Sequence, residues 1–249
     1  MTMEIDNIYN MDCLEGMKQI PDGTIDAVIC DLPYGVLNLE WDSVIPLEPL
    51  WEHYKRVLKP SGVVVLFGTE PFSTKLRMSN LKWFKYDYIW VKDQAANFAS
   101  CRRVPMKYHE VISVFYNKGI TYNMPNLHKI KPIKNGRASK QGTSNQYSGG
   151  DTSYMQDEAG FNESVLYYSN VSNTASIHPT QKPVDLLRYL VLTYTNEGDT
   201  VLDNCMGSGT TAIACIKERR HFIGFELSKD YYNKACKRIK DERQQLTLF

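Results

Sequence analysis

The apolar run Ile25-Asp26-Ala27-Val28-Ile29-Cys30, followed at once by Asp31-Leu32-Pro33-Tyr34-Gly35, decides the fold of this chain. Such a run is typical of a strand buried in a parallel sheet, and open α/β sheets bind ligands just beyond the carboxyl ends of their strands. We therefore expect Asp31 at the lip of a crevice, with Pro33 stiffening the backbone behind it. A carboxylate beside the flat ring of Tyr34 suits an exocyclic amine on a flat heterocycle, because a carboxylate and a carbonyl accept its two hydrogens while the ring stacks. A strand end followed by an ordinary turn is the alternative.

The segments on either side of this stretch extend it into an α/β domain. Residues 5–9 form a candidate strand, and apolar residues at helical spacing in 47–58 predict an amphipathic helix. Residues 63–67 form another buried strand, so strand, helix and strand make a right-handed βαβ unit in a mostly parallel sheet. Asp12 also follows a strand, which places it near Asp31 at the same edge. Alternatively, Asp12 only caps the helix that begins after it.

The chain returns to the same alternation near its end. A helix is expected from Pro183, a strand at 200–202 and another at 222–225, followed by Glu226 and a final helix. Between the strands lies Gly207-Ser208-Gly209-Thr210-Thr211-Ala212, in which glycines let the backbone approach a ligand and a helix start offers free N–H groups. Glu226 ends the next strand, where a carboxylate can bind both ribose hydroxyls of a nucleoside.

This glycine pattern leaves two cofactor classes open. Gly-x-Gly-x-x-Ala matches a dinucleotide fingerprint, so a nicotinamide-dependent oxidoreductase is a rival interpretation. Asp203 at the loop entrance would repel a pyrophosphate but attract an ammonium, and the glycine loop lies near the C-terminus instead of at the start. S-adenosylmethionine has the required adenosine, carboxylate, ammonium and sulfonium groups.

The middle of the chain has a different pattern. Residues 86–91 and 111–116 predict two antiparallel strands at one edge of the sheet, joined by a long basic loop that contains Arg102 and Arg103. Residues 117–177 are the least regular part, and 134–151 are rich in Gly, Ser, Asn and Gln. A loop this long is usually functional or disordered, so it is either the element that touches a macromolecular substrate or an insertion without a role.

Composition narrows the class of protein. The 249 residues are enough for one sizeable core, and 43% hydrophobic with 23% charged residues are typical of a soluble protein. No apolar run is long enough to span a bilayer, and residues 1–6 lack the pattern of a signal peptide, so a cytoplasmic protein is expected. The cysteines are scattered and form no Cys-x-x-Cys pair, which predicts reduced thiols and no metal site; they are residues 13, 30, 101, 205, 215 and 236.

The small net charge of +1 hides a basic segment. Between Lys75 and Lys140 there are 14 Lys or Arg residues and three acidic ones, so the rest of the chain is acidic. Aromatic residues are interleaved with these cations, which favours a nucleic-acid partner over a merely solvated charged face.

Taken together, these motifs resemble those of the β group of DNA amino-methyltransferases, in which a catalytic tetrapeptide precedes the cofactor motif. The resemblance spans nearly the whole chain except about 117–176, where target recognition is expected in that family. The residues that carry it are Asp31-Leu32-Pro33-Tyr34, then His178-Pro179-Thr180-Gln181-Lys182-Pro183, then Asp203 through Thr211, and Glu226, with weaker matches at Asp12-Cys13 and Tyr108-His109-Glu110-Val111-Ile112.

The resemblance implies a fold, an activity and partners. The expected fold is a doubly wound, mostly parallel Rossmann-like methyltransferase sheet with an antiparallel edge hairpin and an irregular target-recognition insertion. Residues 1–116 would form the catalytic half, 117–177 the insertion and 178–249 the cofactor-binding half. The expected activity is transfer of a methyl group from S-adenosylmethionine to an amine of a flipped-out base in double-stranded DNA. A homodimer and a cognate restriction endonuclease are further partners of this kind of enzyme.

The resemblance also assigns residues. Asp31, Leu32, Pro33 and Tyr34 would be catalytic. Arg102 and Arg103 are expected to bind DNA because they lie in the basic loop, independently of the resemblance. The cofactor would be held by Asp12, Cys13, Asp31, Lys182, Asp203, Gly207, Ser208, Gly209, Thr210, Thr211 and Glu226. In this assignment Glu226 takes the ribose, Asp12 the adenine amine, and Lys182 lies near the methionine end, unless Lys182 is simply a solvated lysine before a helix.

Two departures from the family pattern affect these expectations. Leu32 replaces the first proline of the more frequent Asp-Pro-Pro-Tyr, which keeps the backbone carbonyl but lowers rigidity. Asn204-Cys205 replaces the usual Pro-Phe after Asp203. An Asp-led tetrapeptide points to adenine N6, whereas a Ser-led one is more frequent for cytosine N4. Adenine is therefore favoured, cytosine N4 stays open, and an inactive DNA-binding module is a third alternative.

Overall fold

The computed structural model describes residues 3–35, 43–135, 154–171, 176–178 and 180–246, which form two compact units. The first unit comprises residues 1–123 and 163–249, and the second comprises 124–162. The helices are α1 Cys13–Met17, α2 Leu47–Val57, α3 Phe72–Ser79, α4 Val184–Tyr194, α5 Thr210–Lys217 and α6 Lys229–Leu246, with the 3₁₀ turn η1 Phe98–Ser100. The strands are β1 Asn7–Tyr9, β2 Ile25–Cys30, β3 Leu58–Gly68, β4 Phe84–Val91, β5 His109–Phe115, β6 His128–Asn135, β7 Tyr154–Ala159, β8 Val165–Tyr167, β9 Thr200–Asp203 and β10 His221–Phe225.

The first unit is built on an eight-stranded sheet with the order β1-β10-β9-β2-β3-β5-β4-β8. β1, β10, β9, β2 and β3 run parallel, whereas β5 is antiparallel to both β3 and β4. The expected parallel sheet and its antiparallel hairpin are confirmed. One detail differs, because β8 pairs in parallel with β4 and is the outermost strand, so the β4–β5 hairpin is not the edge itself. A three-residue strand within the irregular segment leaves little periodicity to detect.

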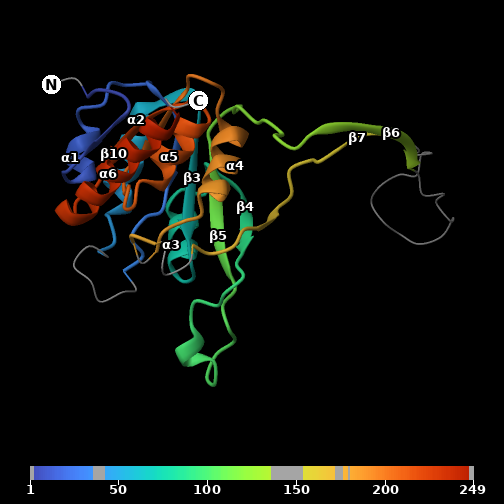
Figure 1. The fold of residues 1–249 in the computed structure, drawn as a ribbon, viewed down its shortest axis with the longest axis horizontal. Helices are drawn as coiled ribbons and strands as arrows, with labels where there is room; N and C mark the ends of the chain where they lie inside the picture. The colour runs from blue at the N-terminus through green and yellow to red at the C-terminus, as the bar shows by residue number, and fades with distance from the viewer. Residues whose placement is uncertain (1–2, 36–42, 136–153, 172–175, 179, 247–249) are drawn as a thin grey trace. The chain divides into compact units, whose positions relative to one another are not determined.

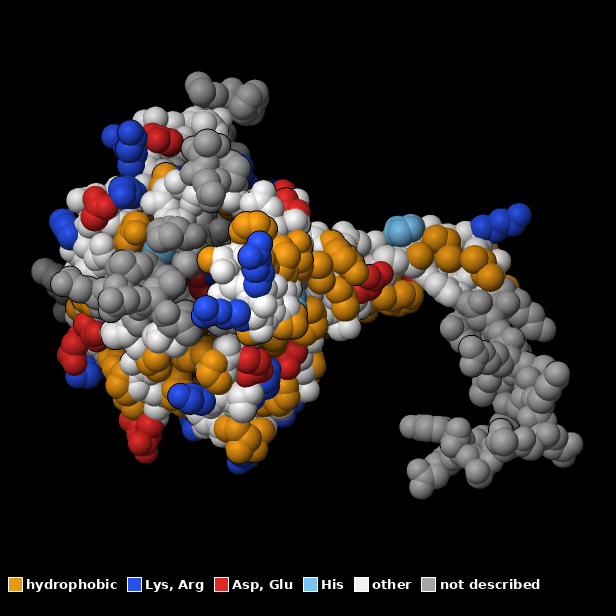
Figure 2. Space-filling view, turned by 90° about the horizontal axis from the view of Figure 1, so that it is seen from below, with side chains coloured by type: hydrophobic (Ala, Val, Ile, Leu, Met, Phe, Trp, Pro, Cys, Tyr) orange, Lys and Arg blue, Asp and Glu red, His pale blue; other side chains and the backbone are white. Residues whose placement is uncertain are grey.

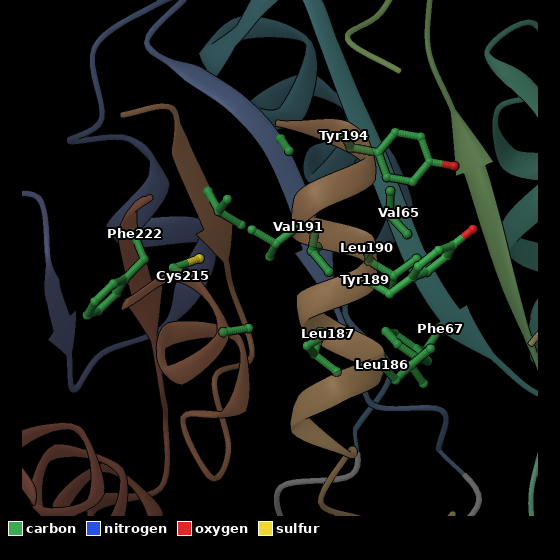
Figure 3. Close-up of a cluster of buried hydrophobic side chains, with 14 of the residues drawn as sticks. Val65, Phe67, Leu186, Leu187, Tyr189, Leu190, Val191, Tyr194, Cys215 and Phe222 are labelled. Carbon is green, nitrogen blue, oxygen red and sulfur yellow. The ribbon is translucent and has the colours of Figure 1, made fainter. Parts of the chain in front are cut away.

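Helices cover both faces of the sheet (Figure 1). On one face α4, α5 and α6 pack over β3 and β9. Figure 3 shows Val191 of α4 on the side of Cys215 in α5, and Leu190 on the side of Val65 and Phe67 in β3. On the other face α1, α2 and α3 cover a second core, in which Trp51 and Tyr54 of α2 are buried. Apolar residues recur every three or four positions along α2 and α4, and both helices bury that stripe.

The parallel arrangement places many loops at one edge of the sheet, which we call the carboxyl edge. β2, β3, β9 and β10 all end there, and the pairing of Val91 with His109 puts the end of β4 and the start of β5 there as well. Residues 92–108 connect these two strands and project from this edge as a finger with η1 at its tip (Figure 1). Ligand-binding residues are expected at the carboxyl edge of such a sheet.

The second unit contains one hairpin. β6 and β7 pair antiparallel, with Lys129 in ion pairs to Asp157 at 3.3 Å and Glu158 at 2.8 Å. The turn after β7 requires glycine, because Gly160 has φ +82° and a Cβ would lie 2.0 Å from the Asn126 carbonyl oxygen. The polar stretch 136–153 between these strands lies outside the described residues. Across the described part of the chain, the structure contains no helix that is both long and apolar enough to cross a membrane.

Candidate active site

Asp31 follows β2 directly and lies at the carboxyl edge, as expected. Its Oδ1 accepts a hydrogen bond from the Tyr34 hydroxyl, and the Tyr34 ring packs against Phe72 of α3 with centroids 5.1 Å apart. Leu32 is buried in the core that α1, α2 and α3 cover, and Pro33 lines a cavity that also contains Asp12 and Glu226. The tetrapeptide is therefore anchored by Leu32 and presents Asp31 and Tyr34 together.

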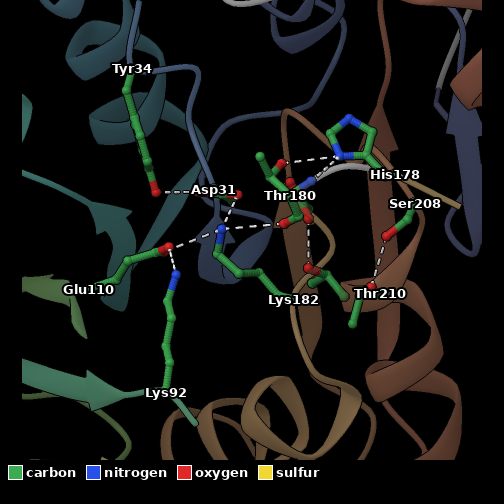
Figure 4. Close-up of polar contacts among 11 residues, drawn as sticks. Asp31, Tyr34, Lys92, Glu110, His178, Thr180, Lys182, Ser208 and Thr210 are labelled. Atoms are coloured by element: carbon green, nitrogen blue, oxygen red, sulfur yellow. Dashed lines mark hydrogen bonds and ion pairs between the residues drawn. The ribbon is translucent and has the colours of Figure 1, made fainter. Parts of the chain in front are cut away.

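Asp31 belongs to a group of four charged side chains, which we call the ion cluster (Figure 4). Lys182 donates to Asp31 and lies 3.4 Å from Glu110 Oε2, and Glu110 also accepts a hydrogen bond from Lys92. The Lys182 ammonium lies over the Phe67 ring, 5.2 Å from its centroid. Two carboxylates and two ammonium groups balance each other, which allows four charges to be buried together.

The charges in this cluster shift one another's pKa values. Burial raises the pKa of Asp31, and the Lys182 ammonium only partly offsets it. Burial disfavours the Lys182 ammonium, but the carboxylates of Asp31 and Glu110 outweigh this and raise its pKa. Burial also works against Glu110, yet Lys182 and Lys92 lower its pKa. Lys182 is only 8% exposed, so the alternative of a solvated lysine before a helix is wrong.

The glycine loop after β9 lines the same cavity as Asp31. Asp31, Lys182, Asp203, Gly207, Ser208, Thr210 and Thr211 surround a cavity of about 40 Å³, together with His178, Phe67 and Met206. Gly207 has φ +53°, a conformation that favours glycine, and a Cβ there would face His178 at 3.8 Å. A motif near the start of the chain and a motif near its end thus meet at one place.

Asp203 is a buried carboxylate with few partners of its own. Its Oδ2 accepts from the Thr211 hydroxyl at 2.6 Å and its Oδ1 accepts from the Cys205 backbone N–H at 3.0 Å. Burial raises the pKa of Asp203 to about 6, and these hydrogen bonds oppose the shift without cancelling it. Among the described residues, Asp203 forms no ion pair, so it can attract a cationic group of a ligand.

A neighbouring cavity of about 120 Å³ contains the other predicted cofactor residues. It is lined by Asp12, Cys13, Pro33, Asn204, Cys205, Glu226 and six further residues, among them His178, which it shares with the first cavity. Glu226 accepts backbone N–H groups of Gly207 at 2.7 Å and Ser228 at 2.8 Å, and burial raises its pKa. Asp12 caps α1, with Oδ1 accepting from Leu14 and Glu15, and also faces the cavity. Capping and cavity lining are therefore compatible.

Five predicted residues line neither cavity, namely Leu32 and Tyr34 of the tetrapeptide, Gly209, Arg102 and Arg103. Gly209 is the N-cap of α5 with φ +78°, and its missing Cβ faces Ala235 of α6 at 3.3 Å. It allows α6 to pack closely behind the loop. Arg102 and Arg103 lie exposed on the finger, next to η1.

Sequence reasoning missed several residues of the site. Lys92 and Glu110 complete the ion cluster, although only Glu110 lay in a quoted motif. His178 packs against Tyr231 with ring centroids 4.2 Å apart, and burial together with the Lys182 and Lys234 charges lowers its pKa to about 4. Arg238 of α6 donates to the Ser208 carbonyl and to the Thr210 hydroxyl, both at 3.0 Å, behind the glycine loop. Glu110 and His178 lie in stretches that carry the family resemblance but were assigned no role, whereas Lys92 and Arg238 come from positions with no local pattern.

With this geometry in hand, comparison with known proteins identifies the family. A model of N6/N4 methyltransferases, described as DNA methylase, matches residues 25–237. The chain belongs to the N6/N4 DNA methylase family. This membership makes the protein a DNA methyltransferase and sets aside the nicotinamide-dependent oxidoreductase.

Individual relatives agree with this assignment. The DNA methylase is 26% identical to the Type II methyltransferase M.HindIII of Haemophilus influenzae. The alignment is 300 positions long, gaps included, and covers 96% of each chain. It is 27% identical to the Type II methyltransferase M.HpaI of Haemophilus parainfluenzae over 93% of this chain and 73% of the relative.

Solved structures show the same fold. The M1.HpyAVI–SAM complex matches with a TM-score of 0.63 at 26% identity, covering 93% of this DNA methylase and 98% of that chain. The cytosine-N4-specific PvuII DNA methyltransferase matches with a TM-score of 0.68 at 15% identity, covering 98% and 93% of the two chains. At that lower identity the likeness shows the fold alone.

Proposed function

We propose that this DNA methylase transfers a methyl group from S-adenosylmethionine to the N6 amine of an adenine flipped out of double-stranded DNA. One observation carries the proposal: Asp31, from the first β-strands, and the Gly207–Thr211 loop, from the last ones, line a single cavity. A carboxylate able to orient an amine therefore lies beside a loop able to hold a nucleoside cofactor.

The donor set of the two cavities fits S-adenosylmethionine. Buried Asp203 supplies negative charge for the cofactor's ammonium, and the backbone of Gly207 through Thr211 supplies close approach and N–H groups at the start of α5. Glu226 would take the ribose hydroxyls and Asp12 the adenine amine, with Cys13 beside it. We assign Lys182, Ser208 and Thr210 to the methionine end, where all three line the cavity.

The chemistry depends on orientation. The bound cofactor supplies an electrophilic methyl group on its sulfonium. The exocyclic amine of adenine is a poor nucleophile because its lone pair is delocalised into the ring. Asp31 and the carbonyl of Leu32 or Pro33 accept hydrogen bonds from its two N–H groups, so the lone pair turns toward the methyl group. The new N–C bond forms as the S–C bond breaks, and the amine loses one proton during or after this step. Alignment of this kind can lower a barrier by up to roughly 7–11 kcal/mol.

Tyr34 and the ion cluster prepare this site. The Tyr34 ring lies beside Asp31 and offers a stacking surface for the flipped base, worth about 1–3 kcal/mol. The Lys182 ammonium favours the ionised form of Asp31 and so opposes the effect of burial on its pKa, and Glu110 gives this ammonium a second partner when the amine of the base takes its place on Asp31. The Asp-led tetrapeptide favours adenine over cytosine N4.

DNA contacts are assigned to the finger and to the insertion. Arg102 and Arg103 would bind phosphates, and residues 117–177 would recognise the target sequence between a catalytic half, 1–116, and a cofactor-binding half, 178–249. Cytoplasmic location, a homodimer and a cognate restriction endonuclease are further predictions. Sedimentation of the purified protein would test the dimer.

One experiment tests the base and the catalytic residue together. Labelled S-adenosylmethionine and DNA are incubated with the wild-type protein, and the digested nucleosides are separated; we expect N6-methyladenine, whereas N4-methylcytosine would refute the choice of base. Asp31→Ala should abolish transfer while cofactor affinity stays within a few fold. Asp22→Asn, which alters an exposed carboxylate, is the control. Unchanged transfer by Asp31→Ala would contradict the catalytic assignment.

A further inference from the structure

The finger carries an unusual group of exposed apolar side chains. Phe98 at its tip is 72% exposed, and Val104, Met106 and Tyr108 are exposed on the same segment. Single exposed apolar residues are normal on a protein surface, but four within eleven residues indicate a contact surface. Figure 2 looks onto the face from which the finger projects and shows hydrophobic and basic side chains side by side.

Hydrogen bonds within the finger hold Phe98 in place. The Lys92 backbone N–H donates to the Tyr108 carbonyl at 2.7 Å, and the Ala96 N–H donates to the Lys107 carbonyl at 3.0 Å. The Asn97 side chain bridges the two arms, because it donates to the Pro105 carbonyl at 3.0 Å and accepts from the Lys107 N–H at 2.7 Å. η1 starts at the next residue, so the phenyl ring is presented by an ordered turn.

The base of the finger is part of the ion cluster. Lys92 begins the finger and Glu110 follows it, and their side chains bond to each other. Glu110 also contacts Lys182, which binds Asp31. A continuous chain of charged contacts therefore fixes where the finger leaves the sheet relative to Asp31 (Figure 4).

The charge of the finger indicates its partner. Arg102 and Arg103 are exposed beside η1, and neither forms an ion pair with any residue that the structure describes. Guanidinium groups next to an exposed aromatic ring suit nucleic acid, in which phosphates and base faces alternate. A protein partner is not needed to explain this combination.

We propose that Phe98 inserts into the DNA base stack and fills the gap left by the flipped target base. This inference rests on the proposed function, because it requires a flipped base at Asp31. Apolar wedges between base steps are a known way to hold distorted DNA, and a phenyl ring stacks on the bases that flank the gap. Phe98 would then stabilise the open duplex from the carboxyl edge while Arg102 and Arg103 bind the adjoining phosphates.

The test compares duplexes in which the target base is paired or already unpaired. The methylated site is first mapped by sequencing modified DNA, and short duplexes are then made with the target either paired or opposite an abasic position. Phe98→Ala should lower kcat/KM on the paired duplex by about ten- to hundredfold. On the unpaired duplex most of this loss should disappear, since the duplex no longer has to be opened.

Two variants separate stacking from folding. Phe98→Trp keeps an aromatic wedge and should retain most of the activity. Met78→Ala removes an apolar side chain of α3 that is 63% exposed, and should leave both duplexes unaffected. Cofactor affinity of Phe98→Ala should equal that of the wild type, which shows that the fold is intact.

Several outcomes would overturn the inference. They include wild-type activity of Phe98→Ala on the paired duplex, or an equal loss on both duplexes. If Phe98→Ala instead dissociates a dimer of the protein and leaves methylation unchanged, the finger is a contact surface between two copies of the chain. Absence of methyl transfer to DNA by the wild-type protein would refute the proposed function itself, so the two failures are distinguishable.

Discussion

Replacing the Asp203 carboxylate should change two properties in opposite directions. The free protein should become more stable, whereas its affinity for S-adenosylmethionine should fall. Asp203 is 4% exposed. Its carboxylate forms no ion pair within the described residues, and burial raises its pKa from 3.8 to about 6. Asp203→Asn keeps the shape of the side chain. The amide oxygen can accept from the Cys205 N–H, and the amide nitrogen can donate to the Thr211 hydroxyl.

The raised pKa determines the size and sign of the effect. Because the folded state binds the proton more tightly than the unfolded state, ionisation of Asp203 lowers the free energy of unfolding as the pH rises above 3.8, by about 3 kcal/mol at pH 7. The asparagine variant lacks this penalty and should be more stable by up to about that amount. As the pH falls, the wild-type carboxylate becomes protonated, and the difference should shrink to about 1 kcal/mol at pH 4.5.

Urea unfolding and cofactor titration measure the two effects. The free energy of unfolding is compared at pH 7 and pH 4.5 without cofactor, with Asp241→Asn on the exposed side of α6 as the control, expected within about 0.5 kcal/mol of the wild type. Affinity for S-adenosylmethionine should fall about ten- to hundredfold in Asp203→Asn, because a hydrogen bond to a charged group is lost. Compared with the wild type, the Asp203→Asn variant should therefore have a higher free energy of unfolding without cofactor and a lower affinity for the cofactor.

Opposite results would refute this reasoning. If Asp203→Asn destabilises the free protein at pH 7, the buried carboxylate has a compensating partner and its pKa is not raised. If stability rises but cofactor affinity is unchanged, Asp203 does not face the cofactor's ammonium. A stability difference that does not depend on pH would exclude ionisation as its cause.

Two further predictions concern the DNA surface and the core. Arg102→Ala combined with Arg103→Ala should weaken DNA binding and reduce the slope of log K against log salt by about 2, measured by titration at several salt concentrations; Arg219→Ala, on the opposite edge of the sheet, should not. An unchanged slope would place the DNA surface elsewhere. Gly16→Ala should destabilise the protein by about 1–3 kcal/mol in urea unfolding, because the new Cβ would lie 2.2 Å from an aromatic ring at the end of β10. Gly119→Ala, which has open space, should not destabilise it, and equal effects would contradict the packing argument.

Local patterns were sufficient for the regular parts of the fold. The buried runs of β2 and β3, the helical stripes of α2 and α4, and the glycine loop before α5 are each encoded within about a dozen residues. Helix α3 and strand β8 were not predicted. α3 has little amphipathic pattern and β8 has three residues, so packing against the sheet decides both.

The residues of the site also fall into two groups, those that local sequence patterns locate and those that only the folded structure brings together. The sequence by itself determined which strand ends carry Asp31, Asp203 and Glu226, because hydrophobic periodicity locates the ends of buried strands. Only the tertiary structure decided that Lys182 binds Asp31, across 151 positions of the chain, and that Glu110 and Lys92 complete the ion cluster. The physical reason is that strand patterns arise from neighbouring residues, whereas the pairing of buried charges depends on which strands become adjacent in the sheet.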